Sequence, residues 1–323
     1  MKNEFEFIET IRRKYNLSKI GDDCAVLPKD SRTDTVMTTD LLVEDIDFKL
    51  EWSKPEFIGH KALAVSLSDV AAMGAKPVWA MLSIGIPEAI WKTDFVEKFY
   101  AGWFDLAGQF DVELIGGDVS RTPDKLVIDS IVAGEVEKGT AVRRSGAKIG
   151  DLIFVSGGLG GAAGGLKLLE AGTRDDSAAK IWQKNLLLKQ LKPSAKVADG
   201  EFLREKNLAT SMIDLSDGLS SDLAHLCRTG QVGARVFADR IPFDVNLLST
   251  AHSPSEKLEL ALNGGEDYEL LFTVSAKDQR QAETEFKKRG FFHVGEITAD
   301  AEIIELIRHE KPEILRPNGF RHF

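Results

Sequence analysis

A stretch of small and apolar residues, KALAVSLSDVAAMGAKP, occupies positions 61–77 and carries one acidic residue, Asp69, near its middle. The spacing of its apolar residues predicts a helix that is buried on most sides. A carboxylate in such a helix costs several kcal/mol unless a partner compensates its charge. Basic residues occur only at the two ends of the stretch, Lys61 and Lys76. We therefore expect Asp69 either to accept backbone N–H bonds near a helix end or to bind a metal ion together with other acids.

The composition limits the classes of partner that the chain could bind. The chain has 323 residues and a formal net charge of −10, so it is acidic and long enough for two domains. A net negative charge argues against a nucleic-acid partner and against an anionic membrane surface. An acidic protein still binds phosphates when divalent cations lie between the phosphates and its carboxylates.

The cysteines and the hydropathy indicate the cellular compartment that such a chain would suit. Two cysteines, Cys24 and Cys227, are present without a CxxC motif, which favours a reduced, cytoplasmic setting. No apolar run reaches the ~18 residues of a membrane span, and the N-terminus lacks the apolar core of a signal peptide. The carboxylate of Asp23 precedes Cys24 and should raise the pKa of its thiol. We therefore expect Cys24 to be a buried structural residue rather than a nucleophile.

Helical and strand patterns are mixed along the whole chain, which predicts an α/β (α+β) fold. A buried helix is expected over residues 55–73, and a short strand over residues 112–115. The polar, glycine-containing segment 137–150 is the expected domain boundary. This boundary gives an N-terminal domain of residues 1–138 and a C-terminal domain of residues 139–323.

Three acid-bearing segments recur in the first half, each after a short apolar stretch. They are Gly21-Asp22-Asp23, Thr38-Thr39-Asp40 and Gly116-Gly117-Asp118. We expect each to be a turn at a strand end, because strand ends deliver side chains to one edge of a sheet. Several carboxylates at one edge repel one another unless a cation lies among them, and their hard oxygen atoms suit Mg²⁺. The alternative is that these acids belong to solvated turns.

The second half offers two further acids and a pair of arginines. Asp214 and Asp217 flank Ser216 in a strand-to-helix turn, IDLSDG. They fit a second metal-facing edge, although Asp217 could serve only as a cap of the helix. Arg143 and Arg144 lie near the expected domain boundary, where they could clamp phosphate oxygens or form a solvated pair.

A glycine-rich segment, residues 155–165, lies between a predicted strand and a predicted helix. Its N–H groups could bind phosphate, or its glycines could allow close packing of helix and strand. Gly158, Gly160 and Ala163 match the dinucleotide pattern G-x-G-x-x-A, but no second strand with a ribose-binding acid follows. The sequence contains neither the Gly-Lys dipeptide of a Walker A loop nor the His-Arg-Asp of protein kinases. Its six histidines show no zinc-binding spacing.

Eight motifs follow one another from residue 20 to the last residue. They are IGDDCAV (20–26), TTDLLVE (38–44), KALAVSLSDVAAMGAKP (61–77), IGGDVSR (115–121), RSGAKIGD (144–151), IDLSDGLSSDL (213–223), GGEDYELLFTV (264–274) and GFRHF (319–323). In these motifs the chain resembles the thiamine-monophosphate kinases, within the superfamily of aminoimidazole ribonucleotide synthetase and selenophosphate synthetase. The resemblance implies a two-domain fold similar to that of aminoimidazole ribonucleotide synthetase. It also implies ATP-dependent phosphorylation of thiamine monophosphate to thiamine diphosphate.

The resemblance further implies a role for named residues. Several Mg²⁺ ions would be held by Asp23, Thr38, Thr39, Asp40, Asp69, Asp118, Asp214 and Asp217. ATP would be contacted by Gly117, Asp118, Arg144 and Ser216, and the acceptor by Glu266. The N-terminal domain would bind metal and ATP and join its sheet to that of a second copy in a homodimer. The C-terminal domain would complete the ATP and acceptor site.

Two positions depart from the pattern of the family on the acceptor side. Asp47 stands where the family usually has a histidine, and Pro317 stands where it usually has a tryptophan. We hypothesise that Asp47 attracts the cationic thiazolium ring and that Phe320 supplies the lost stacking.

The expected chemistry requires no side-chain base or nucleophile, and so no catalytic residue in that sense. A phosphate acceptor is already an anionic nucleophile near neutral pH. Alignment and charge neutralisation would then suffice for direct in-line transfer without a phosphoenzyme. Three alternatives remain. They are a related enzyme of the superfamily with a different acceptor, a nucleotide- or thiamine-phosphate-binding protein without turnover, and, third, a nicotinamide-dependent dehydrogenase.

Overall fold

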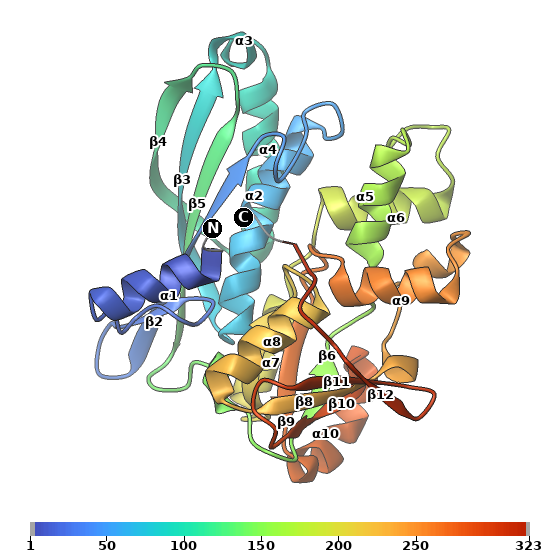
Figure 1. Cartoon of the computed structure of the whole chain (residues 1–323). Helices are drawn as coiled ribbons and strands as arrows, with labels where there is room; N and C mark the ends of the chain where they lie inside the picture. Colours follow the sequence, from blue (N-terminus) through green and yellow to red (C-terminus); the bar gives the residue numbers. More distant parts are fainter. Residues whose placement is uncertain (1–3, 321–323) are drawn as a thin grey trace.

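The computed structural model describes residues 4–320, and its strands form two sheets (Figure 1). The first sheet has the order β1-β2-β5-β3-β4. Its strands are β1 (Ala25–Pro28), β2 (Thr33–Val43), β3 (Lys76–Pro87), β4 (Glu113–Thr122) and β5 (Val127–Glu137). The pairs are antiparallel except β3 with β4, which is parallel. The parallel strand β4 therefore forms one edge of this sheet.

Helices α2 (Pro55–Ala72) and α4 (Phe95–Phe110) lie on one side of the first sheet (Figure 1). Successive strand residues point to opposite faces, and the even-numbered residues of β2 and β5, such as Val36 and Ile128, are the buried ones that face α2. On the opposite face the side chain of Met81 is 37% exposed. One face of the first sheet is thus covered, and the other is open in the single chain. The short helices α1 (Glu4–Lys14) and α3 (Glu88–Trp91) complete this half.

Helices α2 and α4 pack backbone against backbone at two glycines. A Cβ atom added to Gly59 would lie 1.9 Å from the carbonyl oxygen of Phe99, and one added to Gly102 would lie 1.9 Å from that of Glu56. No side chain fits into either gap, so the two glycines set the distance between the helices. This contact fixes where α2 lies over the sheet.

The second sheet has the order β12-β11-β8-β10-β6-β9-β7. Its strands are β6 (Leu152–Val155), β7 (Ala209–Asp214), β8 (Gly233–Phe237), β9 (Leu270–Val274), β10 (Phe292–Thr298), β11 (Ile304–Arg308) and β12 (Lys311–Ile314). Six helices accompany it: α5 (Gly161–Glu170), α6 (Ile181–Leu191), α7 (Val197–Glu205), α8 (Leu219–Gly230), α9 (Pro254–Asn263) and α10 (Ala276–Arg289). Three 3₁₀ turns, η1 (Arg144–Gly146), η2 (Ala238–Arg240) and η3 (Leu247–Ser249), lie between these elements. Within residues 4–320, no helix is both long and apolar enough to cross a membrane.

The two halves share one hydrophobic core in addition to their own packing. The largest cluster of buried side chains includes Leu67 of α2 and Phe272 of β9. The guanidinium of Arg204 on α7 donates to the carbonyl oxygen of Gly74, just after α2, at 2.8 Å. Helix α2 therefore lies between the two sheets and packs on both halves, as the apolar stretch at its centre requires. The predicted two-domain α/β (α+β) fold is confirmed, and the predicted boundary between residues 138 and 139 falls in the connection from β5 to β6.

Two of the three acid-bearing segments lie inside strands and not at strand ends, so the predicted turns are wrong for these two. Thr38-Thr39-Asp40 lies in the middle of β2, and Gly116-Gly117-Asp118 lies in the middle of β4. The predicted end of the strand at residue 115 fails because β4 continues to pair with β3 as far as Thr122. Gly117, with φ +154°, lets the backbone of β4 approach β3 closely at that point.

Candidate functional site

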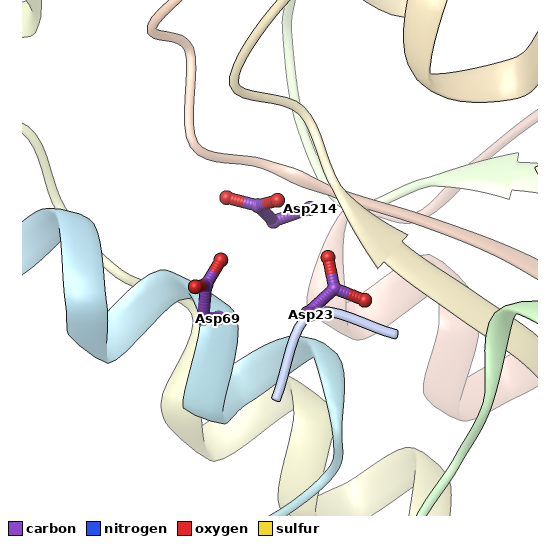
Figure 2. Close-up of side chains that lie close together, drawn as sticks. All are labelled: Asp23, Asp69 and Asp214. Atoms are coloured by element: carbon purple, nitrogen blue, oxygen red, sulfur yellow. The ribbon is translucent and has the colours of Figure 1, made fainter. Parts of the chain in front are cut away.

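Three carboxylates converge from distant parts of the sequence (Figure 2). Asp23 comes from the turn before β1, Asp69 from α2 and Asp214 from the end of β7. One oxygen of each carboxylate lies within 4.8 Å of the others. We call these three residues the acid cluster.

Each member of the acid cluster has a side-chain partner. The hydroxyl of Thr38 on β2 donates to Asp69, and the hydroxyl of Ser68 donates to Asp214 at 2.7 Å. Arg144 pairs with Asp23 through two nitrogens, at 2.7 and 3.2 Å. Of the two possibilities for Asp69, the structure favours convergence with other acids, since its described hydrogen bond comes from Thr38 and not from backbone N–H groups.

The acid cluster carries more negative charge than its partners compensate. Burial, and then the neighbouring carboxylates, raise the pKa of Asp69 well above its usual range. Burial and the charge of Asp23 raise the pKa of Asp214 to about 8, against the hydrogen bond from Ser68. These shifts mean that a cation among the oxygens would stabilise the charged form. Carboxylate and hydroxyl oxygens are ligands that suit Mg²⁺.

Asp40 connects the acid cluster to a large cavity. It accepts a hydrogen bond from Ser66 of α2 at 2.6 Å, and burial raises its pKa to about 6. The cavity has a volume of about 680 Å³ and lies between the two halves of the chain. Its polar lining includes Asp40, Asp47, Lys61, Gln190, Ser216, Asp217 and Glu266. Its apolar lining includes Trp52, Val65, Leu169, Tyr268 and Phe320. The cavity is thus charged on some walls and apolar on others, as suits a ligand with a ring and an anionic group.

Asp217 lines the cavity at the start of the helix that follows it. The carboxylate of Asp222 accepts the backbone N–H groups of Asp217 and Gly218 at the start of α8. The backbone N–H of Phe320 donates to the carbonyl oxygen of Asp217 at 3.2 Å, which brings the C-terminal segment to the cavity. Residues 321–323 of the motif GFRHF lie outside the described residues.

Three residues with predicted roles lie away from the acid cluster: the metal ligand Thr39, the ATP contact Gly117, and Asp118, predicted for both roles. Asp118 lies opposite Ser83, which lies opposite Asp129, and Asp129 accepts a hydrogen bond from Thr39 at 2.7 Å. This row of side chains is on the open face of the first sheet, whereas Asp40 is on the covered face and Asp69 lies on helix α2, which covers it. Gly117 is adjacent to Asp118 on β4. Within a single chain, the structure does not bring these residues to the cavity.

The glycine-rich segment before α5 is explained by packing. Both oxygens of Asp267 accept backbone N–H groups at the start of this helix, from Gly160 at 2.6 Å and from Ala162 at 3.1 Å. A Cβ atom on Gly165 would lie 2.1 Å from the carbonyl oxygen of Leu186. Two of the N–H groups that could bind a phosphate thus donate instead to a carboxylate of the chain itself.

Some residues of the site were not singled out from the sequence. In the sequence pattern Lys61 marks only a basic end of the apolar stretch, and Ser66, Ser68 and Gln190 are not among the predicted site residues. The spacing of Lys61, Val65 and Asp69 would have indicated a shared face of the helix. No comparable signal exists for Gln190, because its helix reaches the cavity only through tertiary packing.

Comparison with known proteins places these features in a family context. Residues 21–136 match the model of the AIR synthase related protein N-terminal domain, and residues 148–307 match that of its C-terminal domain. The thiamine-monophosphate kinase of Escherichia coli strain K12 is 40% identical over 306 residues, which cover 94% of this chain and 91% of that protein. The thiamine-monophosphate kinase of Bacillus subtilis strain 168 is 35% identical, covering 94% of this chain and 93% of that protein.

Solved structures resemble the fold over nearly the whole chain. The structure of AaThiL complexed with AMPPCP and TMP has a TM-score of 0.88 at 30% identity, covering 99% of this chain and 97% of that one. The thiamine-monophosphate kinase of Stenotrophomonas maltophilia K279a has a TM-score of 0.79 at 36% identity, covering 94% and 96%.

Proposed function

Since this chain belongs to the thiamine-monophosphate kinase family of AIR synthase related proteins, we propose that it transfers a phosphoryl group from ATP to thiamine monophosphate. The observation that carries the proposal is the acid cluster beside a cavity whose walls combine charged and apolar side chains. In this proposal residues 1–138 supply most of the metal ligands, and residues 139–323 complete the nucleotide and acceptor sites.

We propose that Asp23, Asp69 and Asp214 hold Mg²⁺, assisted by Thr38 and Asp40. The donor set fits the ion, because all the side-chain donors are hard oxygens and the raised pKa values of Asp69 and Asp214 report carboxylates that lack a sufficient counter-charge. When bound, Mg²⁺ neutralises charge on phosphate oxygens. Asp217 faces the cavity from the loop after β7, and we propose that it contributes a further ligand on that side.

For the nucleotide, we propose contacts from Arg144 and Ser216, with Gly117 and Asp118 contributing from β4. Arg144 is held against Asp23 by two hydrogen bonds, so its planar guanidinium already lies at the acid cluster. Such a group binds phosphate oxygens through two parallel bonds. We propose that Thr39 and Asp118 act at the site of the assembled protein, because both lie on the open face of the sheet.

The acceptor would lie in the cavity, with contacts from Glu266, Asp47 and Phe320. One oxygen of Asp47, the residue at the position of the usual histidine, accepts the backbone N–H of Val43 at 2.7 Å, which fixes this side chain in its turn. The phosphate of the acceptor acts as the nucleophile, so the residues of the chain need only bind, orient and exclude water. Cys24 remains a poor nucleophile, because burial and the nearby Asp69 raise the pKa of its thiol well above its usual range.

We further propose a homodimer that forms through the first sheet. Its open face carries Met81, and exposed apolar surface on a sheet is generally covered by a partner. The second copy would also cover the open face at Thr39 and Asp118 and so shield these side chains from solvent. A cytoplasmic setting is supported by the two free cysteines, Cys24 and Cys227.

The proposal is tested by coupled measurement of ADP release with Mg-ATP and three acceptor conditions: thiamine, thiamine monophosphate and no acceptor. We expect ADP with thiamine monophosphate only, and none after chelation of the metal. ADP release that requires another phosphate would instead indicate a related enzyme with a different acceptor. Binding of ATP without any ADP release would indicate a nucleotide-binding protein. A phosphorylated protein trapped after one turnover would contradict direct transfer.

A further inference from the structure

We propose that Lys61 is a positioning residue for the acceptor, because its side chain ties Glu266 of the C-terminal half to the N-terminal half at the wall of the cavity. This inference rests on the proposed function, since it assumes that the cavity receives the acceptor. It adds a residue whose role is to hold another side chain in place.

The contacts of Lys61 span the two halves of the chain. Its ammonium nitrogen lies 2.5 Å from one carboxylate oxygen of Glu266 and donates to the carbonyl oxygen of Asp47 at 3.1 Å. The side chain of Lys61 is only 4% exposed, whereas that of Glu266 is 26% exposed. A lysine is rarely buried to this extent unless it is paired, so the position of this cation is set by these two contacts.

Glu266 is held from a second direction as well. Gln190 on α6 donates to the other carboxylate oxygen of Glu266. The carboxylate is therefore fixed between α2, through Lys61, and α6, through Gln190. Such fixation aligns an acceptor contact before the ligand arrives, which lowers the entropic cost of binding.

The backbone of Glu266 is also constrained. Its φ of +66° is a left-handed conformation that is uncommon for a residue other than glycine. Its N–H donates to the carbonyl oxygen of Ser216 at 2.8 Å. A strained backbone of this kind persists only where the surroundings hold it, and it often occurs at functional sites. The bond to Lys61 is part of what holds it.

Helix α2 relates Lys61 to the acid cluster. Ile58, Lys61 and Val65 line the cavity, and Asp69 follows on the same face of the helix. Eight residues of helix separate Lys61 from Asp69, which corresponds to roughly 12 Å. One face of one helix thus carries Asp69, one member of the acid cluster, toward one end and the cation of Lys61 toward the other. In the proposed reaction, the phosphate end of the acceptor would point toward Asp69 and the rest of it toward Glu266.

Without Lys61, the carboxylate of Glu266 would lose its only described ion-pair partner in a cavity that already contains Asp40, Asp47 and Asp217. Repulsion among these acids would turn Glu266 away from its present position. The acceptor would then bind more weakly, while the nucleotide contacts near Arg144 would be unaffected.

The test compares Lys61→Met with Lys54→Met. Lys54 also pairs across the two halves, with Asp175 at 2.9 Å, but its side chain is 57% exposed and does not line the cavity. We expect Lys61→Met to raise the KM for thiamine monophosphate about 10- to 100-fold, the range for a lost hydrogen bond to a charged group. The KM for ATP should stay within about twofold, and Lys54→Met should change neither value. An unchanged acceptor KM in a folded Lys61→Met protein would overturn the inference.

A double-mutant cycle separates positioning from a direct contact. If Lys61 acts through Glu266, the protein with both Lys61→Met and Glu266→Gln should bind the acceptor no more than about threefold more weakly than the worse single variant. If the two substitutions instead weaken acceptor binding by the product of their separate effects, the positioning role is wrong. If Lys61→Met does not fold, Lys61→Arg provides the measurement. Arginine keeps the charge but not the compact geometry of an ammonium, so we expect an intermediate acceptor KM, and a wild-type value would count against the inference.

Failure of the proposed function would be recognised separately, because the wild-type protein would then release no ADP with thiamine monophosphate. In that case calorimetric titration with thiamine monophosphate, in the presence of a non-hydrolysable ATP analogue, measures the effect of Lys61→Met on acceptor affinity without turnover. Equal affinity of the wild type and Lys61→Met, or no binding by either, would then contradict the role of Lys61.

Discussion

At the scale of single residues, the acid cluster gathers negative charge that destabilises the fold unless protons or a cation neutralise it. Asp69 and Asp214 are brought within a few ångströms of Asp23 by elements that are held in place by other contacts. The raised pKa values show that the folded protein without metal favours protonated carboxyls at this site. In the proposed function, protons and Mg²⁺ would therefore compete for the same oxygens.

This competition predicts the pH dependence of stability without metal. A carboxyl with a pKa of about 8 in the folded protein, like that of Asp214, binds its proton more tightly than in the unfolded chain, where the value is about 4. The contribution of this group to the free energy of unfolding is therefore greatest below about pH 4 and is lost as the pH rises to about 8. We expect the Tm in EDTA to fall by at least about 4 °C between pH 5.5 and pH 8.5, and Mg²⁺ to restore it most at pH 8.5.

Scanning calorimetry of two variants checks the origin of this slope. Asp214→Asn should reduce the dependence of the Tm in EDTA on pH, because the substituted side chain no longer titrates. Asp105→Asn, which changes a carboxylate with 64% exposure of its side chain, should leave it unchanged. A wild-type Tm in EDTA that rises with pH over this range would contradict the electrostatic account of the cluster.

At the scale of secondary-structure elements, helix α2 connects the parts of the site. It supplies Lys61, Ser66, Ser68 and Asp69, and it packs on strands of both sheets. Its position depends on the close contact with α4 at Gly59 and Gly102. The helix that supplies these polar side chains is therefore positioned by two glycines, which have no side chain that could take part in the reaction.

This dependence predicts opposite effects of alanine at two glycines of α4. Gly102→Ala should lower the free energy of unfolding by at least about 2 kcal/mol, because its Cβ would lie 1.9 Å from the carbonyl oxygen of Glu56. Gly108→Ala has no atom within 4 Å of the added Cβ. It should raise the free energy of unfolding by about 0.5–1 kcal/mol through helix propensity. Urea unfolding of both variants measures these values, and equal effects would argue against the backbone contact.

At the scale of the whole molecule, the open face of the first sheet predicts assembly. Met81→Asp places a charge in the middle of this face, and we expect it to convert a dimer into a monomer in sedimentation velocity at micromolar concentration. The activity should fall with it, since Thr39 and Asp118 lie on the same face. Leu248→Asp is the matched control, because Leu248 is 57% exposed in the C-terminal half. A wild-type protein that is already monomeric would refute the proposed assembly.

The sequence predicted the parts of the molecule that depend on local pattern. The buried helix with a central acid was expected over residues 55–73 and is found over Pro55–Ala72. The meeting of Asp23, Asp69 and Asp214 followed from motif resemblance and charge, although their roles as ligands stay predictions. Local pattern could not tell which face of a strand Asp118 occupies, because that depends on pairing with β3. It also could not show that Asp267 accepts two backbone N–H groups at the start of α5, because this contact joins residues about a hundred positions apart.

The spread of the acid cluster along the sequence has a consequence for biosynthesis. Its members stand at positions 23, 69 and 214, so about two thirds of the 323 residues must be made before the third acid exists. The core around α2 likewise includes Phe272 and Phe286, which are translated later still. A chain emerging from the ribosome, and any fragment released early, would therefore lack a complete metal site. In the proposed function, such incomplete products could not consume ATP.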